Sequence, residues 1–271
     1  MTEPDKYFLG YMRKEQERLQ QQAEQLAHEA SWLLDQIGLQ AGASALEIGC
    51  GPRGCLDLLA ARVGPSGKVV GIERSKEAVK LARELVEKRG FGNVEVLHGD
   101  ARSTKLKKAS FDLVTARLVL VNVPNPEQIV SEAEALACPG GTVAFHEIDW
   151  LGVVCDPPES AWTALVELFK TYTKANGIDL FIGRKLPRLL RHVGLIDVRV
   201  NPIVHVHPPE DVRRSLLPDF AESLRERLVA QNLITDKEFV DLQEREKSHI
   251  ENPDTFVMVG PYVQAWGRKP G

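Results

Sequence analysis

Short apolar runs alternate with helical patterns along the first half of the chain. Five runs are nearly continuous in apolar residues, as is typical of strands that are buried on both faces of a parallel sheet. They cover residues 44–48, 68–72, 94–97, 111–116 and 142–148. The segments with apolar residues at helical spacing are 55–63, 75–89 and 126–136. Because parallel strands need right-handed crossovers, this alternation predicts a doubly wound α/β sheet.

The pattern changes on both sides of this region. Residues 11–36 repeat apolar positions at steps of three and four, which predicts one long N-terminal helix. After residue 150, the pattern predicts two helices, a strand, a long helical stretch and a final strand. These elements cover 159–175, 183–192, 198–206, 209–251 and 256–266, and the final strand is expected to break around Gly260 and Pro261. The length of 271 residues suits one large domain with a helical insertion.

The composition is that of an ordinary globular chain, with 43% hydrophobic and 27% charged residues. Its 38 acidic residues exceed its 34 basic ones, so it lacks the overall positive charge that favours nucleic acid. No apolar run reaches the roughly 20 residues that span a membrane, and the first ten residues lack an apolar leader. The four cysteines form no CxxC pair. We therefore expect a cytoplasmic monomer or homodimer with no nucleic-acid or membrane partner.

A glycine-rich turn follows the first predicted strand. It reads EIGCGPRG over residues 47–54, and it leads directly into a predicted helix. Glycines such as Gly49 and Gly51 allow a sharp turn and a close approach of a ligand to the backbone. A diphosphate matches this turn poorly, because Glu47 places a carboxylate two residues before the first glycine. Glu47 suits either a ligand with an ammonium group or a hydrogen-bond network that orients the loop.

Two more acidic residues mark the ends of the next strands. Glu73 ends the second strand, where a carboxylate can accept hydrogen bonds from both hydroxyls of a ribose. Asp100 follows the third strand, where it can accept from an adenine amino group while Ala101 offers its backbone N–H. Arg74, beside Glu73, can stack on adenine or face solvent. Because the carboxyl ends of a doubly wound sheet share one crevice, these residues together predict a nucleoside site.

Five sequence motifs lie in order between residues 47 and 150: EIGCGPRG, GIERS, HGDA, FDLVTARLVLVNVPNPE and CPGGTVAFHEIDW. Together they resemble the motifs of class I S-adenosylmethionine-dependent methyltransferases of the small-molecule type. The resemblance is strongest over residues 40–150. It implies a seven-stranded Rossmann-like sheet whose last strand is antiparallel. It also implies S-adenosylmethionine as the cofactor, with S-adenosylhomocysteine as its product.

The resemblance assigns roles to the residues at the strand ends. The glycine turn would contact the methionine part of the cofactor, Glu73 its ribose and Asp100 its adenine, while Arg117 would border it. The cofactor-binding set is then Glu47, Gly49, Gly51, Glu73, Arg74, Asp100, Ala101 and Arg117. The sequence departs from many relatives at Asn122, where they carry a histidine.

We expect a single methyltransferase domain, residues 1–271, in four parts that follow the predicted elements. An N-terminal helical lid covers residues 1–40, and the cofactor-binding core covers 41–206. A helical cap insertion covers 207–254, and the final strand covers 255–271.

Methyl transfer from a sulfonium is an in-line displacement that depends mainly on positioning, although a hydroxyl acceptor benefits from a general base. His146 and Asp149, at the end of the fifth strand, are the catalytic candidates. His146 would act as the base, and the competing interpretation is a buried histidine of the core. Asp149 would orient the substrate. Several carboxylates around one point would be needed for a metal, so we expect none.

Aromatic residues outside the sheet are the candidates for acceptor binding, and an apolar lining would favour a small, largely apolar acceptor. They are Tyr7, Tyr11, Trp32, Trp150 and Phe181. The N-terminal ones can instead serve only to dock the first helix. Two other functions remain open: methylation of protein or RNA, and binding of S-adenosylmethionine without methyl transfer, as in a rearrangement catalyst or a binding protein.

Overall fold

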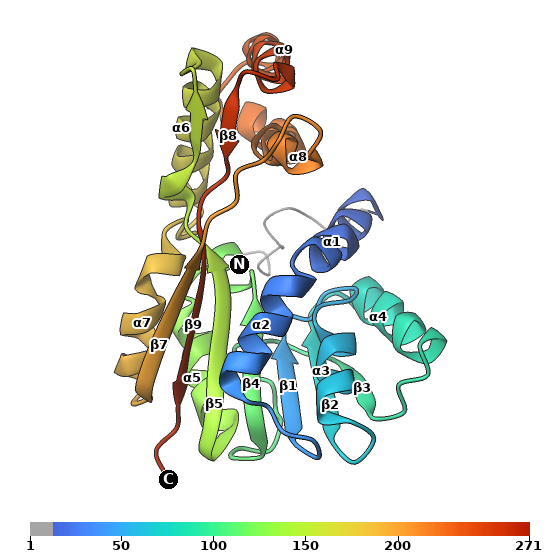
Figure 1. Cartoon of the computed structure of the whole chain (residues 1–271). Coiled ribbons are helices and arrows are strands. Elements are labelled where there is room, and N and C mark those ends of the chain that lie inside the picture. Colours follow the sequence, from blue (N-terminus) through green and yellow to red (C-terminus); the bar gives the residue numbers. More distant parts are fainter. Residues whose placement is uncertain (1–12) are drawn as a thin grey trace.

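A seven-stranded sheet forms the centre of the chain, whose residues 13–271 are described by a computed structural model (Figure 1). The strands are β1 (Ser44–Ile48), β2 (Lys68–Glu73), β3 (Val94–His98), β4 (Phe111–Arg117), β5 (Ala137–Ile148), β7 (Ile196–Ile203) and β9 (Tyr262–Arg268). Their order in the sheet is β3-β2-β1-β4-β5-β9-β7. The first five strands pair in parallel, and β9 runs antiparallel to both of its neighbours. The predicted doubly wound sheet with an antiparallel last strand is therefore confirmed.

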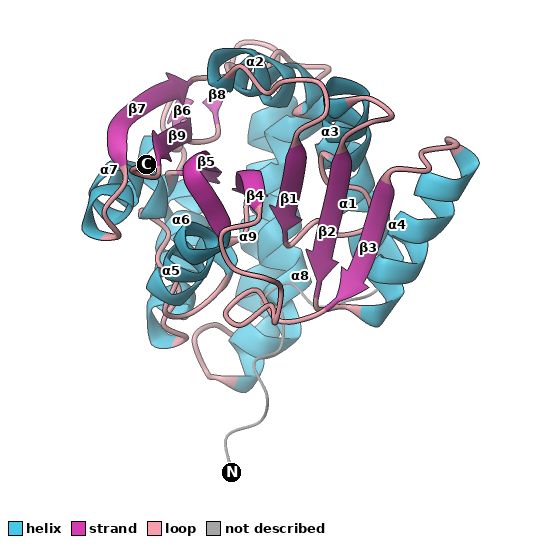
Figure 2. Cartoon of the chain, turned by 90° about the horizontal axis from the view of Figure 1, so that it is seen from below, coloured by secondary structure: helices cyan, strands magenta, loops and turns pink. Residues whose placement is uncertain are grey.

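Helices cover both faces of the sheet (Figure 2). They are α2 (Ala27–Ile37), α3 (Leu56–Val63) and α4 (Lys76–Lys88) on one face, and α5 (Glu127–Leu136) and α7 (Ile182–His192) on the other. Successive strand residues point to opposite faces. Leu113 of β4 accordingly packs in the same cluster as Leu59 of α3, while the adjacent Val114 packs in the cluster of Ile129 and Leu186.

A layer of helices lies beyond the carboxyl ends of the parallel strands, at the top of Figure 1. We call it the cap layer; its members are α6 (Ser160–Ala175), α8 (Leu216–Ala230), α9 (Asp236–Glu251) and the strand pair β6 (Val154–Asp156) and β8 (Phe256–Met258). The predicted stretch 209–251 is divided into a short 3-10 helix, η3 (Val212–Ser215), and then α8 and α9. Thr235 and Glu238 form a capping box that starts α9. The cap layer also takes in α6 and β6, which the sequence-based division placed in the core.

Two predicted elements are broken in the structure. The N-terminal helix is divided at Leu26 into α1 (Arg13–Gln25) and α2, and α1 extends past the edge of the sheet (Figure 1). The final strand is interrupted at Gly260, where the sequence predicted a break, and this glycine has a φ of 55° and lies against the Asp149 carbonyl. The segment before this break leaves the main sheet and pairs with β6. Within residues 13–271, no helix has the length and apolar character needed to cross a membrane.

Candidate functional site

A cavity opens at the carboxyl ends of the parallel strands, between the sheet, α1 and the cap layer. Its walls come from the glycine turn, the ends of β2 to β5, and residues of α1, α6 and α8. All eight residues of the predicted cofactor-binding set line it: Glu47, Gly49, Gly51, Glu73, Arg74, Asp100, Ala101 and Arg117. The topology therefore brings together residues that lie up to 70 positions apart in the sequence.

Glu47 holds the glycine turn in place. Its two carboxylate oxygens, Oε1 and Oε2, accept the Cys55 backbone N–H at 2.9 and 2.8 Å, and its side chain is buried. Gly54 has a φ of 56° and lies directly against this carboxylate. Burial raises the pKa of Glu47 to about 7, against the opposing charge of Arg117. This geometry supports the loop-orienting interpretation of Glu47 over direct contact with an ammonium group.

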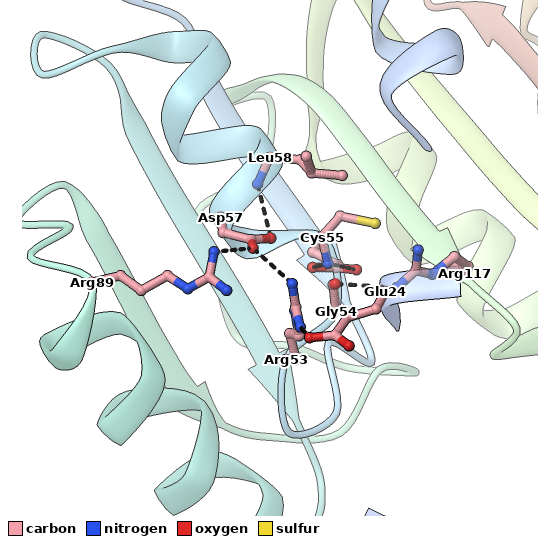
Figure 3. A network of polar contacts seen from close by, with 9 residues as sticks. Glu24, Arg53, Gly54, Cys55, Asp57, Leu58, Arg89 and Arg117 are labelled. Carbon is pink, nitrogen blue, oxygen red and sulfur yellow. Dashed lines mark hydrogen bonds and ion pairs between the residues drawn. The ribbon is translucent and has the colours of Figure 1, made fainter. Parts of the chain in front are cut away.

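A network of charged side chains ties the turn to its neighbours (Figure 3). Arg53 forms ion pairs with Glu24 of α1 and, at 3.3 Å, with Asp57 of α3. Asp57 also pairs with Arg89, after α4, at 2.9 Å. Arg117 of β4 donates from Nη2 to the Gly54 carbonyl at 3.1 Å. Four elements therefore fix the position of one loop.

The two carboxylates at the next strand ends are also held in place. Glu73 accepts the backbone N–H of Ser75 at 2.7 Å and that of Gly51 at 3.1 Å. Asp100 pairs with Arg102 at 2.8 Å, and this hydrogen bonding lowers the pKa of Asp100, which keeps the carboxylate ionised. Arg102 lines the cavity as well. It was missed because a loop arginine two residues after Asp100 carries no distinctive sequence signal.

Glu147 is another buried carboxylate, and it holds a turn that lines the cavity. Glu147 accepts the backbone N–H groups of Val119, Leu120 and Val121 at 2.9, 2.8 and 3.2 Å. These residues belong to the turn around the 3-10 helix η1 (Leu120–Asn122). Burial raises the pKa of Glu147 to about 7, and the three N–H donors oppose this rise. Val119 lies against Gly49, so this turn packs directly on the glycine turn.

Aromatic rings wall the end of the cavity that faces the cap layer. Trp150 packs edge-on to Phe169 of α6 at 4.9 Å and to Phe220 of α8 at 5.6 Å between ring centroids. We call these three residues the aromatic cluster; Tyr262 of β9 also lines this end. Trp150 was predicted for acceptor binding, whereas Phe169, Phe220 and Tyr262 were missed. Nothing in the local sequence distinguishes these three residues, because only the fold brings α6, α8 and β9 together.

Both catalytic candidates lie outside the cavity wall. His146 is buried, lies edge-on to Tyr262 at 5.6 Å, and forms no ring-nitrogen hydrogen bond within the described chain. Burial lowers its pKa to about 3, helped by the charges of Arg117 and His205. The structure therefore favours the interpretation of a core histidine. Asp149 is buried in an ion pair with Arg184, at 2.7 Å between Oδ1 and Nη2, which joins the end of β5 to α7.

Two more predicted acceptor residues, Trp32 and Phe181, also lie away from the cavity. Trp32 packs edge-on against Trp266 of β9 at 6.2 Å, where it covers the sheet. Phe181 lies under the Arg184 guanidinium, 5.3 Å from its centre, at the start of α7. Tyr7 and Tyr11 lie outside the described residues. Among residues 13–271, no group of three or more His, Cys, Asp or Glu side chains could hold a metal ion.

Comparisons with known proteins identify the family of the chain. A family model described as a methyltransferase domain matches residues 39–182, which is more than half of the chain. A demethylmenaquinone methyltransferase from Geobacillus kaustophilus is 35% identical over 188 residues, which cover 63% of this chain and 78% of that protein. An uncharacterized 37.1 kDa protein in transposon TN4556 of Streptomyces fradiae is 36% identical over 183 residues, which cover 65% of this chain and 50% of that protein. The chain spans about half the length of this protein and of other curated relatives.

A solved structure shares the fold. It is phosphoethanolamine N-methyltransferase 2 from Haemonchus contortus, in complex with phosphomonomethylethanolamine and S-adenosylhomocysteine. It matches with a TM-score of 0.57 and 19% identity, over 90% of this chain and 53% of that one. The chain therefore belongs to the methyltransferase-domain family, and its resemblance to class I S-adenosylmethionine-dependent methyltransferases is confirmed.

Proposed function

We propose that this chain transfers a methyl group from S-adenosylmethionine to a small, largely apolar acceptor. One observation carries the proposal: a single cavity joins two unlike ends. One end is walled by Glu73, Asp100 and the glycine turn, and the other by the aromatic cluster. Bound S-adenosylmethionine supplies an activated methyl group on a positively charged sulfur. A nucleoside end and an apolar end in one cavity suit a reaction between this cofactor and an apolar partner.

The residues at the nucleoside end fit this cofactor. Glu73 and Asp100 line the cavity with carboxylate oxygens, which are acceptors for ribose hydroxyls and an adenine amino group. Glu73 is already oriented by the N–H groups of Gly51 and Ser75. A Cβ atom at Gly51 would meet nothing within 4 Å, so the turn leaves open space beside its backbone. A ligand can therefore approach the main chain closely at this point.

The chain's part in the transfer is to hold the acceptor in line with the methyl group. Positioning of this kind can contribute roughly 7–11 kcal/mol. We expect Trp150, Phe169 and Phe220, whose rings pack edge-on, to exclude water from the acceptor end, while Glu147 fixes the turn around η1 through three hydrogen bonds. We infer that α1 and the cap layer act as lid and cap, because both contribute to the cavity wall.

The apolar walls favour a quinone-like compound or another aromatic metabolite as the acceptor. The similarity to a protein named demethylmenaquinone methyltransferase supports this class. We also propose that the chain acts as a monomer or homodimer on small molecules and not on nucleic acid, in keeping with its excess of acidic over basic residues.

The test is incubation of the purified chain with S-adenosylmethionine and a panel of small aromatic acceptors, read by mass spectrometry. The proposal expects one acceptor to gain a methyl group while an equal amount of S-adenosylhomocysteine forms. Phe169→Leu should slow this transfer without weakening cofactor binding. Trp32→Phe, which alters an aromatic contact away from the cavity, should change neither. Cofactor binding without any methylated product across the panel would favour a protein that binds S-adenosylmethionine without transferring its methyl group.

A further inference from the structure

The charges that line the cavity are unevenly distributed. Four arginines face three carboxylates among the described lining residues. All three carboxylates lie at the nucleoside end, and each is already engaged: Glu47 by Cys55, Glu73 by Gly51 and Ser75, and Asp100 by Arg102. Among residues 13–271, no carboxylate lines the acceptor end, and no histidine lines the cavity. A cationic acceptor would find no counter-charge from this part of the chain.

A guanidinium already occupies the aromatic cluster. The central carbon of Arg18, on α1, lies 5.1 Å from the ring centroid of Phe220. Phe220 is also stacked nearly parallel to Phe169, with an angle of 3° between the rings. Aromatic faces commonly bind ligand ammonium groups, but here the chain's own cation takes that position. The cluster therefore presents apolar ring surface beside a positive charge.

Other positive charges act on the same end of the cavity. Burial raises the pKa of Tyr262, and the charges of Arg213, Arg18 and Arg117 all oppose that rise. The charge of Glu29 raises the pKa of Tyr262. Glu29 lies 3.0 Å from His205, however, and does not line the cavity. Nη1 of Arg117 is buried and forms no hydrogen bond within the described chain, while Nη2 binds the Gly54 carbonyl. Of the three arginines, Arg213 is paired with Asp211 at 2.6 Å and does not line the cavity, whereas Arg18 and Arg117 do line it.

We propose that the acceptor end, formed by Arg18, Arg117, Tyr262 and the aromatic cluster, binds a planar ring that carries an anionic oxygen, and that Arg18 sets this preference over ammonium compounds. Carboxylates and ionised phenols or enols share this chemistry. The identification of this ligand as the methyl acceptor rests on the proposed function. The positive sulfur of the cofactor would add to the same preference, and an acceptor that arrives ionised needs no general base from the chain.

The test compares three probes of similar shape: 1-naphthoate, 1-naphthylmethanol and 1-naphthylmethylammonium. Each is titrated calorimetrically into the full chain saturated with S-adenosylhomocysteine. We expect 1-naphthoate to bind most tightly and the ammonium compound at least about tenfold more weakly, a factor that corresponds to 1.4 kcal/mol. 1-Naphthol titrated at pH values on both sides of its own ionisation separates phenolate from carboxylate recognition. Equal or tighter binding of the ammonium probe by the wild-type chain would overturn the proposal.

Variants of Arg18 test whether this residue sets the preference for anionic over cationic rings. Arg18→Gln should remove the difference between the anionic and cationic probes, and Arg18→Lys should retain it. Arg225→Gln is the matched control, because Arg225 lies 5.5 Å from the Phe239 ring in the cap layer but does not line the cavity. This variant should keep the wild-type order of affinities. An unchanged preference in a folded Arg18→Gln protein would contradict the role of Arg18.

Failure of this inference and failure of the proposed function are distinguishable. Preference for 1-naphthoate without any methyl transfer would leave the anionic subsite standing and remove the transferase activity. Methyl transfer to an amine, together with a preference for the ammonium probe, would support the transferase activity and overturn the anionic subsite.

Discussion

Glu47 and Gly54 are packed so tightly that a Cβ atom at position 54 would lie 2.7 Å from the Glu47 carboxyl carbon. Position 54 also has a φ of 56°, in the left-handed region that favours glycine. The glycine is therefore needed for two reasons, its backbone conformation and the space that the carboxylate occupies.

Gly54→Ala should displace the Glu47 carboxylate and with it the turn that lines the nucleoside end. We expect the affinity for S-adenosylhomocysteine, measured by calorimetry, to fall about tenfold or more, the equivalent of 1.4 kcal/mol. Gly64→Ala is the control, because Gly64 has a φ of 67° but nothing within 4 Å of an added Cβ atom. It should lower the melting temperature and leave cofactor affinity unchanged. Equal losses of affinity in both variants would mean that strain alone, and not the contact with Glu47, explains the effect.

His146→Phe should leave the chemistry intact. His146 lies off the cavity wall, and burial holds its pKa at about 3. Once an acceptor is known, we expect kcat to change less than about threefold and its pH profile to keep its shape, whereas loss of a general base typically costs roughly 10²–10⁴-fold. A larger loss, together with a missing inflection in the pH profile, would restore His146 as the base.

Glu246 should make the stability of the cap layer depend on pH. Its side chain is fully buried in α9, and neither carboxylate oxygen forms a hydrogen bond within the described chain. Burial, helped by the charge of Asp219, raises its pKa from 4.5 to about 8. Between these two values the folded chain keeps the proton while the unfolded chain releases it. Stability from this group is therefore greatest at low pH and is lost as the pH rises toward 8.

Glu246→Leu removes this dependence. We expect a gain of about 1–3 kcal/mol in the free energy of unfolding at pH 8, and a smaller difference from wild type below pH 4.5. Denaturant unfolding of both proteins at a series of pH values measures this difference in the free energy of unfolding. The exposed Glu244 on the same helix provides the control variant Glu244→Leu, which should show no such trend. A constant difference at all pH values would show that Glu246 does not titrate in this range.

The sheet was predictable because its signals are local. The five parallel strands are short apolar runs, and Ser75 caps α4 by accepting the Ala78 N–H at 3.2 Å. Glu73 and Asp100 could be placed in one site because parallel strands end at one edge of the sheet. The pattern of buried strands therefore determined both the fold and the nucleoside end of the cavity.

The acceptor end could not be predicted because its residues come from separate elements. Phe169 and Phe220 lie 51 positions apart, on two helices whose contact depends on the whole cap layer. Trp32 and Trp150 were both predicted for acceptor binding, yet Trp32 packs on the sheet and Trp150 lines the cavity. The break at Gly260 was predicted from the sequence, but the pairing of the segment before it with β6 was not, because no local pattern shows that contact.

Calorimetric titration of S-adenosylhomocysteine into the wild-type chain and into Glu73→Gln is the direct test of cofactor binding in this cavity. We expect one site per chain in the wild type. We expect an affinity at least about tenfold lower in the variant, since a hydrogen bond to a charged group contributes about 1.5–3 kcal/mol. Glu84→Gln, an exposed change on α4, should bind as the wild type does. Absence of binding by the wild-type chain, or equal binding by Glu73→Gln, would contradict the assignment of this cavity to the cofactor.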